Sequence, residues 1–109
     1  MPEPTEPSQE QPILSFEEFV ASNPRTGYPR YNNFFGYFDS QMAVFYKDEP
    51  HYVRFEKENP ELTEKIKQGV ANRDRSVDSN VALQPIIPDL YEAYKIMRSY
   101  GVSDDMLFS

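Results

Sequence analysis

The sequence contains a single histidine, His51, which is the first side chain to consider for chemistry. A neutral imidazole can serve as a general base, as part of a catalytic triad or as a metal ligand. Its neighbours Glu49, Pro50 and Tyr52 are typical of a turn. Because the chain offers no second histidine and no cysteine to complete such a site, we interpret His51 as an exposed turn residue.

Paired carboxylates are the second group that could carry chemistry, since two acids flanking a bond can act as general acid and general base. Such pairs occur at Asp48 with Glu49 and at Glu56 with Glu58. Both pairs lie in highly charged stretches, where carboxylates stay ionised and solvated. The sequence therefore predicts no catalytic residue. A small hydrolase with an unrecognised carboxylate site stays an alternative.

No metal or cofactor site is predicted either. Without cysteine or a second histidine, a transition-metal site would need several carboxylates, and Asp104 with Asp105 is too small a cluster. The four glycines are scattered, so none builds a phosphate-binding loop. We expect no metal and no cofactor, and we interpret the two aspartates as helix-capping residues.

Tyrosine and arginine side chains gather at the start of the segment 25–38, the locally basic part of the chain. These two residue types dominate the hot spots of protein interfaces. Pro24, Gly27 and Pro29 keep the stretch out of regular structure and near the surface. The sequence predicts a partner-binding surface formed by Arg25, Tyr28, Arg30 and Tyr31.

Two further interpretations concern apolar side chains. The same aromatic and arginine segment, 25–38, could stack single-stranded nucleic acid, although a net charge of −7 disfavours binding to polyphosphate. Near the other end of the chain, three apolar residues either pack on the core or offer a second partner surface: Met106, Leu107 and Phe108.

These side chains need supporting elements, and the most informative stretch is 42–57. Its two halves are rich in Val, Phe and Tyr and flank a polar segment with Pro50, which is typical of two strands joined by a turn. We predict a β-hairpin, in one of two registers that place opposite faces in the core. The alternative is a helix from Pro50 to Glu58, because proline fits the first helical position.

Two more extended segments are predicted beside this hairpin. The aromatic run 34–38 could form a third strand with a bulge at Gly36. Residues 81–87 are apolar and contain Pro85, so we predict an extended segment at an edge rather than a central strand.

Helices are predicted on both sides of the hairpin. Ser15 and Glu18 form the S-x-x-E pattern of a capping box, which predicts a short helix over 16–21. A second helix is predicted over 60–68, with proline at its first position and Gly69 as its C-cap.

The clearest helical pattern covers residues 88–100. Its apolar residues recur at i, i+3, i+4 and i+7, which places them on one face: Leu90, Ala93, Tyr94 and Met97. Gly101 should end this helix, because glycine readily adopts the left-handed conformation of a C-cap.

Together these elements predict one small α+β domain over residues 13–109, an antiparallel sheet of two or three strands covered by two or three helices. With 109 residues and 15% aromatic content, the chain can bury one modest core. Residues 1–12 are mostly proline, glutamate and other polar types, so we predict a disordered acidic N-terminal tail.

The function that these features favour is non-catalytic binding to another protein, as a small adaptor, assembly factor or regulator. We expect a monomer or a weak homodimer. No apolar run is long enough to span a membrane, and the first residues lack the parts of a signal peptide. Since the absence of cysteine fits a reducing compartment, we expect a cytoplasmic location.

Overall fold

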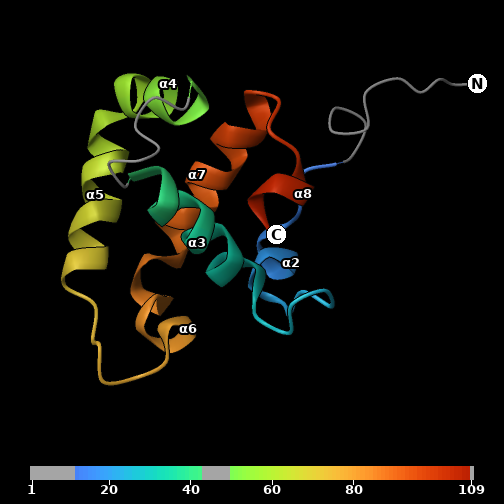
Figure 1. Ribbon diagram of the computed structural model, residues 1–109, viewed down its shortest axis with the longest axis vertical. Coiled ribbons are helices and arrows are strands. Elements are labelled where there is room, and N and C mark those ends of the chain that lie inside the picture. The colour runs from blue at the N-terminus through green and yellow to red at the C-terminus, as the bar shows by residue number, and fades with distance from the viewer. Residues whose placement is uncertain (1–11, 43–49, 109) are drawn as a thin grey trace, which may run out of the picture.

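The computed structural model describes residues 12–42 and 50–108, and over these ranges the protein is all-α (Figure 1). The elements in chain order are α2 (Phe16–Val20), α3 (Arg30–Met42), α4 (Pro50–Glu58), α5 (Pro60–Ala71), α6 (Ser79–Ala82), the 3-10 helix η2 (Gln84–Ile86), α7 (Ile87–Ser99) and α8 (Asp104–Leu107). The β-type pairing within these ranges is one isolated bridge between Ser22 and Pro29. The predicted α+β fold is therefore wrong. Residues 1–11 of the predicted tail lie outside the described residues.

The hairpin predicted near 42–57 is wrong where the structure describes it, because residues 50–58 form α4. Tyr52 and Phe55 lie one helical turn apart and are both buried, so a helix places both large rings in the core. Pro50 occupies the first helical position, where its missing N–H is not needed. The alternative helix is thus confirmed. Residues 43–49, which would have formed a strand and the turn, lie outside the described residues.

The third strand predicted for 34–38 is also wrong, because these residues lie inside α3. Tyr31, Phe34 and Phe38 recur at i, i+3 and i+7 and are buried on one face of the helix. Gly36 lies on the exposed side of α3 and forms no bulge. Burial of three rings offsets the cost of about 1 kcal/mol that a glycine brings to a helix interior.

The extended segment predicted for 81–87 is replaced by the end of α6, the 3-10 helix η2 and the first residue of α7. Pro85 fits near the start of η2, where no backbone donor is needed. Leu83 and Ile86 are buried three residues apart, which matches the period of a 3-10 helix.

The three predicted helices are confirmed with shifted ends. The capping box of α2 is complete: Glu18 N donates to Ser15 Oγ at 3.2 Å, and Ser15 N donates to Glu18 Oε1 at 2.9 Å. The predicted helices over 60–68 and 88–100 are α5 and α7. Gly101 follows α7 with φ of 96°, as a C-cap glycine requires.

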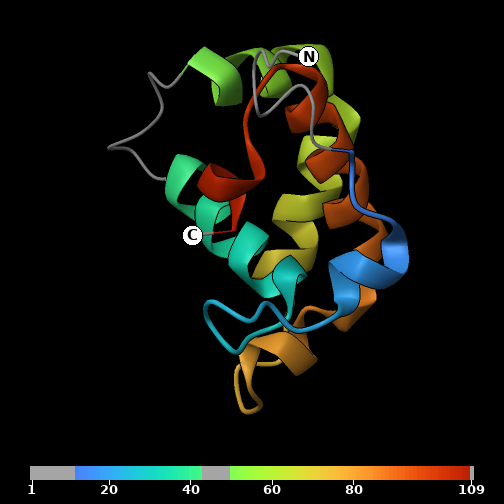
Figure 2. The same ribbon diagram turned by 90° about the vertical axis from the view of Figure 1, so that its right-hand side faces the viewer.

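Helix α7 lies at the centre of the arrangement. Helix α3 crosses it, α5 lies alongside it, and α2 packs on its other side (Figures 1 and 2). The buried face of α7 is the predicted one, formed by Leu90, Ala93, Tyr94 and Met97. No helix of the described ranges has both the length and the apolar character that crossing a membrane requires.

The core between these helices is largely a cluster of aromatic rings. The ring of Phe19 on α2 stacks on Tyr94 with centroids 5.4 Å apart and lies 6.1 Å from Phe34 of α3. It also lies 6.2 Å from Phe108, which follows α8. Rings bury more area than aliphatic side chains, so this cluster joins four segments in a chain that has no tryptophan.

Gly69 is not the C-cap that the sequence predicts but an interior residue of α5, which continues to Ala71. A Cβ atom built at Gly69 would overlap Cγ2 of Ile86 in η2. The absence of a side chain therefore lets the backbone of α5 approach η2 closely. At Gly36 of α3, by contrast, a Cβ would meet no atom within 4 Å.

These two glycines give a matched pair of substitutions. Gly36→Ala should raise the free energy of unfolding by about 0.5 to 1 kcal/mol, because alanine is the better helix former. Gly69→Ala should lower it by about 1 kcal/mol or more, because the overlap with Ile86 exceeds that gain. Urea denaturation of both variants measures the difference. Equal and positive changes would show that η2 moves freely away from α5.

Candidate functional site

The loop between α2 and α3 holds the first predicted surface in a fixed shape. Asn23 N donates to Tyr28 O at 2.8 Å, and Gly27 N donates to Asn23 O at 2.7 Å. Gly27 has φ of 80°, a left-handed conformation that glycine adopts without strain. The loop is thus closed by its own backbone bonds and presents its side chains outward.

The four residues predicted there do not all reach the surface. Tyr28 is 57% exposed, and the Arg25 side chain is 63% exposed. Tyr31 is only 5% exposed and donates its hydroxyl to Asn80 O, so its ring belongs to the core. Arg30 is half-buried and donates from Nη1 to two carbonyl oxygens at the end of α2, those of Glu18 and Ser22.

The second predicted surface, 106–108, is likewise divided. Leu107 and Phe108 are buried, so they pack on the core, whereas Met106 is 51% exposed. Ser103 caps α8 by accepting from Met106 N at 3.3 Å, and Asp104 and Asp105 follow in its first turn. The capping residue is Ser103, so the interpretation of Asp104 and Asp105 as the caps is wrong, and these two aspartates lie in the first turn of α8.

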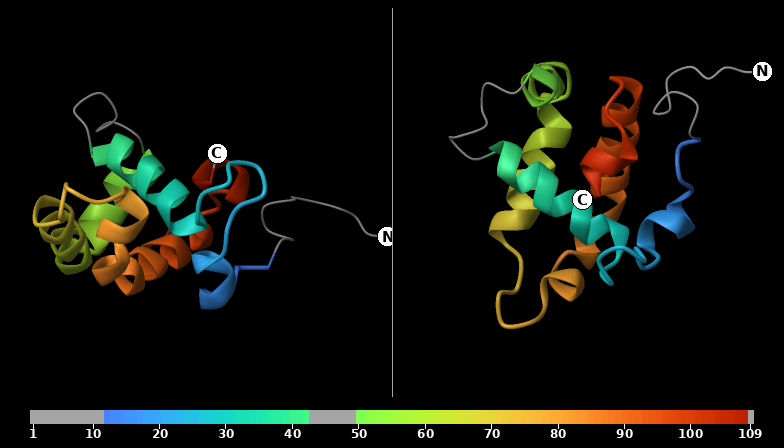
Figure 3. Two further views of the ribbon diagram at one scale, coloured as in Figure 1. Left: turned by 90° about the horizontal axis from the view of Figure 1, so that it is seen from below. Right: turned by 45° about the vertical axis from the view of Figure 1, so that its right-hand side comes forward.

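The two predicted surfaces lie side by side (Figure 3). Arg25 Nη1 and Asp105 Oδ1 are 3.2 Å apart, and Asn23 Nδ2 donates to Phe108 O at 3.2 Å. The loop and α8, about 80 residues apart in sequence, therefore form one surface. We call it the loop–α8 surface and define it by four exposed side chains: Arg25, Tyr28, Asp105 and Met106.

A cavity of about 310 Å³ lies at this surface. Its walls combine apolar side chains with two arginines and two aspartates: Pro12, Leu14, Asn23, Arg25, Arg30, Asp104, Asp105 and Phe108. Among these described lining residues there is no Ser, Thr, Cys, His or Lys, and the two carboxylates, those of Asp104 and Asp105, are each paired with an arginine. The cavity is equipped to bind a group of mixed apolar and charged character.

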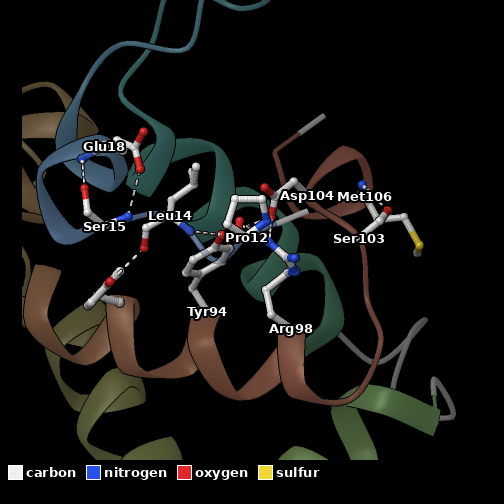
Figure 4. A network of polar contacts seen from close by, with 10 residues as sticks. Pro12, Leu14, Ser15, Glu18, Tyr94, Arg98, Ser103, Asp104 and Met106 are labelled. Atoms are coloured by element: carbon white, nitrogen blue, oxygen red, sulfur yellow. Dashed lines mark hydrogen bonds and ion pairs between the residues drawn. The ribbon is translucent and has the colours of Figure 1, made fainter. Parts of the chain in front are cut away.

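A buried polar network lies beside this cavity (Figure 4). Arg98 Nη1 lies 2.7 Å from Asp104 Oδ1, and their side chains are 3% and 20% exposed. The same nitrogen donates to the Tyr94 hydroxyl at 3.1 Å and to Pro12 O at 3.4 Å. Removing one partner from such a buried pair typically costs about 3 to 5 kcal/mol.

The hydroxyl of Tyr94 uses its whole hydrogen-bonding capacity in this network. It donates to Asp104 Oδ1 at 3.0 Å and accepts from Arg98 Nη1 and from Leu14 N, the latter at 3.0 Å. Tyr91 donates to Leu14 O at 2.7 Å. Side chains of α7 thus hold both backbone groups of Leu14, and the segment before α2 is fixed as one wall of the cavity.

Sequence reasoning missed the network. Arg98 follows the core residue Tyr94 by four positions, so it lies on the same helical face, and this spacing was a usable signal. From the sequence alone, Asp104 is interpreted only as a capping residue, and Arg98 is not singled out. Asn23 was likewise missed, although its buried amide joins the loop to Phe108.

The interpretation of His51 as an exposed turn residue is wrong, because it lies in the first turn of α4 and is half-buried. The carboxylates considered for chemistry have structural partners where the structure describes them. Glu56 accepts from Lys67 Nζ at 2.9 Å, and Glu58 accepts from Arg54 and Tyr100. Hydrogen bonds from Tyr100 and Arg54 lower the pKa of Glu58. Asp48 and Glu49 lie outside the described residues. Within the described ranges, no group of three His, Cys, Asp or Glu residues is placed to hold a metal ion.

Comparison with known proteins gives no relative: no family model, curated protein or solved structure matches the chain.

The network predicts how stability depends on alkaline pH. Burial raises the pKa of Tyr94 to about 12, and Asp104 adds to the increase. Because the pKa is higher in the folded than in the unfolded chain, this contribution is complete below pH 10 and is lost as the pH rises towards 12. The contribution of Tyr94 to the free energy of unfolding should fall by at most about 1.4 kcal/mol per pH unit.

Urea denaturation between pH 8 and pH 11.5 tests this prediction. Tyr94→Phe should be less stable at pH 8, since the buried Arg98 and Asp104 lose a partner, but its stability should fall less steeply above pH 10. Tyr28→Phe changes an exposed tyrosine and should keep the wild-type slope. A slope that is unchanged in Tyr94→Phe contradicts the assignment.

Proposed function

We propose that the protein is a non-catalytic protein-binding module, acting as an adaptor, assembly factor or regulator, and that it binds its partner through the loop–α8 surface. The observation that carries this proposal is the ion pair between Arg25 and Asp105, which joins two segments about 80 residues apart into one exposed patch. Tyr28, from the same loop as Arg25, and Met106, from the same helix as Asp105, supply exposed apolar area.

The residue types on this surface support binding to protein. Tyrosine, arginine and methionine are enriched in interface cores, where they combine large contact area with hydrogen bonding. Tyr28 stands on a loop closed by backbone hydrogen bonds from Asn23 and Gly27, so its backbone loses little freedom on binding. The cavity next to it can receive one side chain of a partner.

Two observations favour a protein over single-stranded nucleic acid as the partner. Asp104 and Asp105 line the same cavity as the arginines, and their carboxylates would repel the closely spaced phosphates of a nucleic acid. Rings that would have to stack bases are in the core, including those of Tyr31, Phe34 and Phe38. The two carboxylates that line the cavity, those of Asp104 and Asp105, are each paired with an arginine, which likewise favours binding over acid–base hydrolysis.

The proposal includes a cytoplasmic site of action for a monomer or weak homodimer. A chain without cysteine needs no oxidising compartment for its stability, and the described core is built from aromatic and aliphatic side chains.

A pair of double variants tests the proposed function. Tyr28→Ala with Met106→Ala removes the exposed apolar groups of the loop–α8 surface and should leave the melting temperature within a few degrees of wild type. The control, Val53→Ala with Lys57→Ala, changes exposed positions on α4, at the top of Figure 1. Each protein is used to capture its partner from cells of the source organism, with quantitative mass spectrometry.

The surface variant should lose the partner that wild type and control capture, and its affinity for the purified partner should fall by at least about tenfold, since two hot-spot residues are removed. Equal capture by both variants would place the binding surface elsewhere. Unfolding of the surface variant would show that Tyr28 or Met106 is needed for the fold.

A further inference from the structure

Two arginines and two aspartates line the cavity, and a third arginine, Arg98, lies buried beside it. Arg25 is paired with Asp105, and Asp104 is paired with Arg98. Among the described residues, Arg30 has no carboxylate within ion-pair distance. With Arg98 counted, three guanidinium groups are matched by two carboxylates, so the positive charge of Arg30 is left without a carboxylate partner at the cavity.

Both lining arginines keep donors for a ligand. The side-chain bonds of Arg25 and Arg30 to other described residues all use Nη1. Each guanidinium has five N–H groups, so Nε and Nη2 remain available on both, in the fork geometry that suits a carboxylate. The donors are held in place, since Arg30 is anchored to the end of α2 and Arg25 to α8.

We infer that the cavity binds a partner segment that carries one side-chain carboxylate next to an apolar side chain. The carboxylate takes the free donors of Arg25 and Arg30, and the apolar side chain lies against Leu14 and Phe108. This inference rests on the proposed function and names the chemistry of the partner at the same site.

The balance of charge argues for a single carboxylate rather than a phosphate group. One net positive charge complements one negative charge, whereas a phosphate monoester carries nearly two, and Asp104 and Asp105 would repel the second. The open rim argues for the interior of a segment rather than a chain terminus. The side chains of Arg25 and Asp105 are 63% and 79% exposed, so the part of the rim that they form is open to a passing peptide.

The test uses peptide mixtures on the full-length protein. The probes are acetylated and amidated hexapeptides with a central Leu-Glu or Phe-Glu pair, and the matched controls carry glutamine in place of glutamate. Titration of the ¹⁵N-labelled protein should shift the amide signals of Arg25, Arg30 and Phe108 with the glutamate mixture. The glutamine mixture should bind at least about threefold more weakly, because it lacks the charge.

Two variants break the same ion pair from opposite ends and provide the decisive comparison. Arg25→Gln lowers the charge of the cavity, so affinity for the glutamate mixture should fall about threefold or more. Asp105→Asn raises that charge and frees Arg25, so affinity should rise by a similar factor. Because both variants lose one exposed ion pair, their melting temperatures should match. Affinity changes of the same sign would overturn the inference.

Other outcomes would also overturn it. The first is binding of free-acid peptides through their terminal carboxylate that equals or exceeds the binding of the amidated peptides. The second is competition by inorganic phosphate at equal concentration. The third is peptide binding that appears only when Glu3, Glu6 and Glu10 are all changed to Gln. The last result would make the protein's own acidic N-terminal residues the occupant. If no peptide binds while Tyr28→Ala with Met106→Ala still abolishes partner capture, the partner segment is of another chemistry and the proposed function stands.

Discussion

A buried guanidinium must be neutralised, and the position of Arg98 imposes that constraint on three segments of this chain. Its partners are the carboxylate of Asp104, the hydroxyl of Tyr94 and the carbonyl of Pro12. Losing one partner of a buried ion pair costs several kcal/mol, which is a large part of the total stability of about 5 to 15 kcal/mol of a typical domain. The segment before α2 and the start of α8 are therefore held against α7, and the walls of the cavity follow from that placement.

The aromatic cluster complements this polar constraint. The ring of Phe19 packs α2 against Tyr94 of α7, and the ring of Phe108 packs the segment after α8 against Phe19. The rings thus fill the core between segments whose orientation the ion pair fixes. Most of the described aromatic rings lie in or against the core, and the exposed ones are those of Tyr28, at 57%, and Phe16, at 43%. An exposed tyrosine on a backbone-bonded loop next to a cavity is the arrangement on which the proposed function depends.

The sequence predicted those elements whose signals are local. The capping box at Ser15 and the apolar face around Tyr94 depend on residues within one or two turns, and both are confirmed. The strand predictions for residues 34–38 and 50–58 are wrong because they rest on aromatic composition, which favours strands. The spacing of the buried rings, three or four residues apart, is helical. In both segments the spacing of the buried rings, rather than the β-propensity of aromatic residues, agrees with the observed secondary structure. The all-α fold was recoverable from the positions of Tyr31, Phe34 and Phe38.

The candidate site could be predicted only in part, for a different physical reason. Arg25, Tyr28 and Met106 were identified by residue type, because exposed interface residues have a characteristic composition. Their proximity was not predictable, since it results from contacts between residues more than 80 positions apart, such as Asn23 with Phe108. The burial of Arg98 was missed for a related reason. A charged side chain is expected at the surface unless its partner is known, and Asp104 lies beyond the end of the helix.

The contact of Phe19 with Phe108 has a consequence for synthesis on the ribosome. The ring of Phe19 cannot enter its native environment until α7 and the segment after α8 have left the exit tunnel, because its neighbours include Tyr91, Tyr94 and Phe108. At a translation rate of about 5 to 20 residues per second, the nascent α2 waits on the order of 5 to 20 seconds with its apolar face unsatisfied. The native packing around Phe19 can therefore form only after Phe108 has been synthesised.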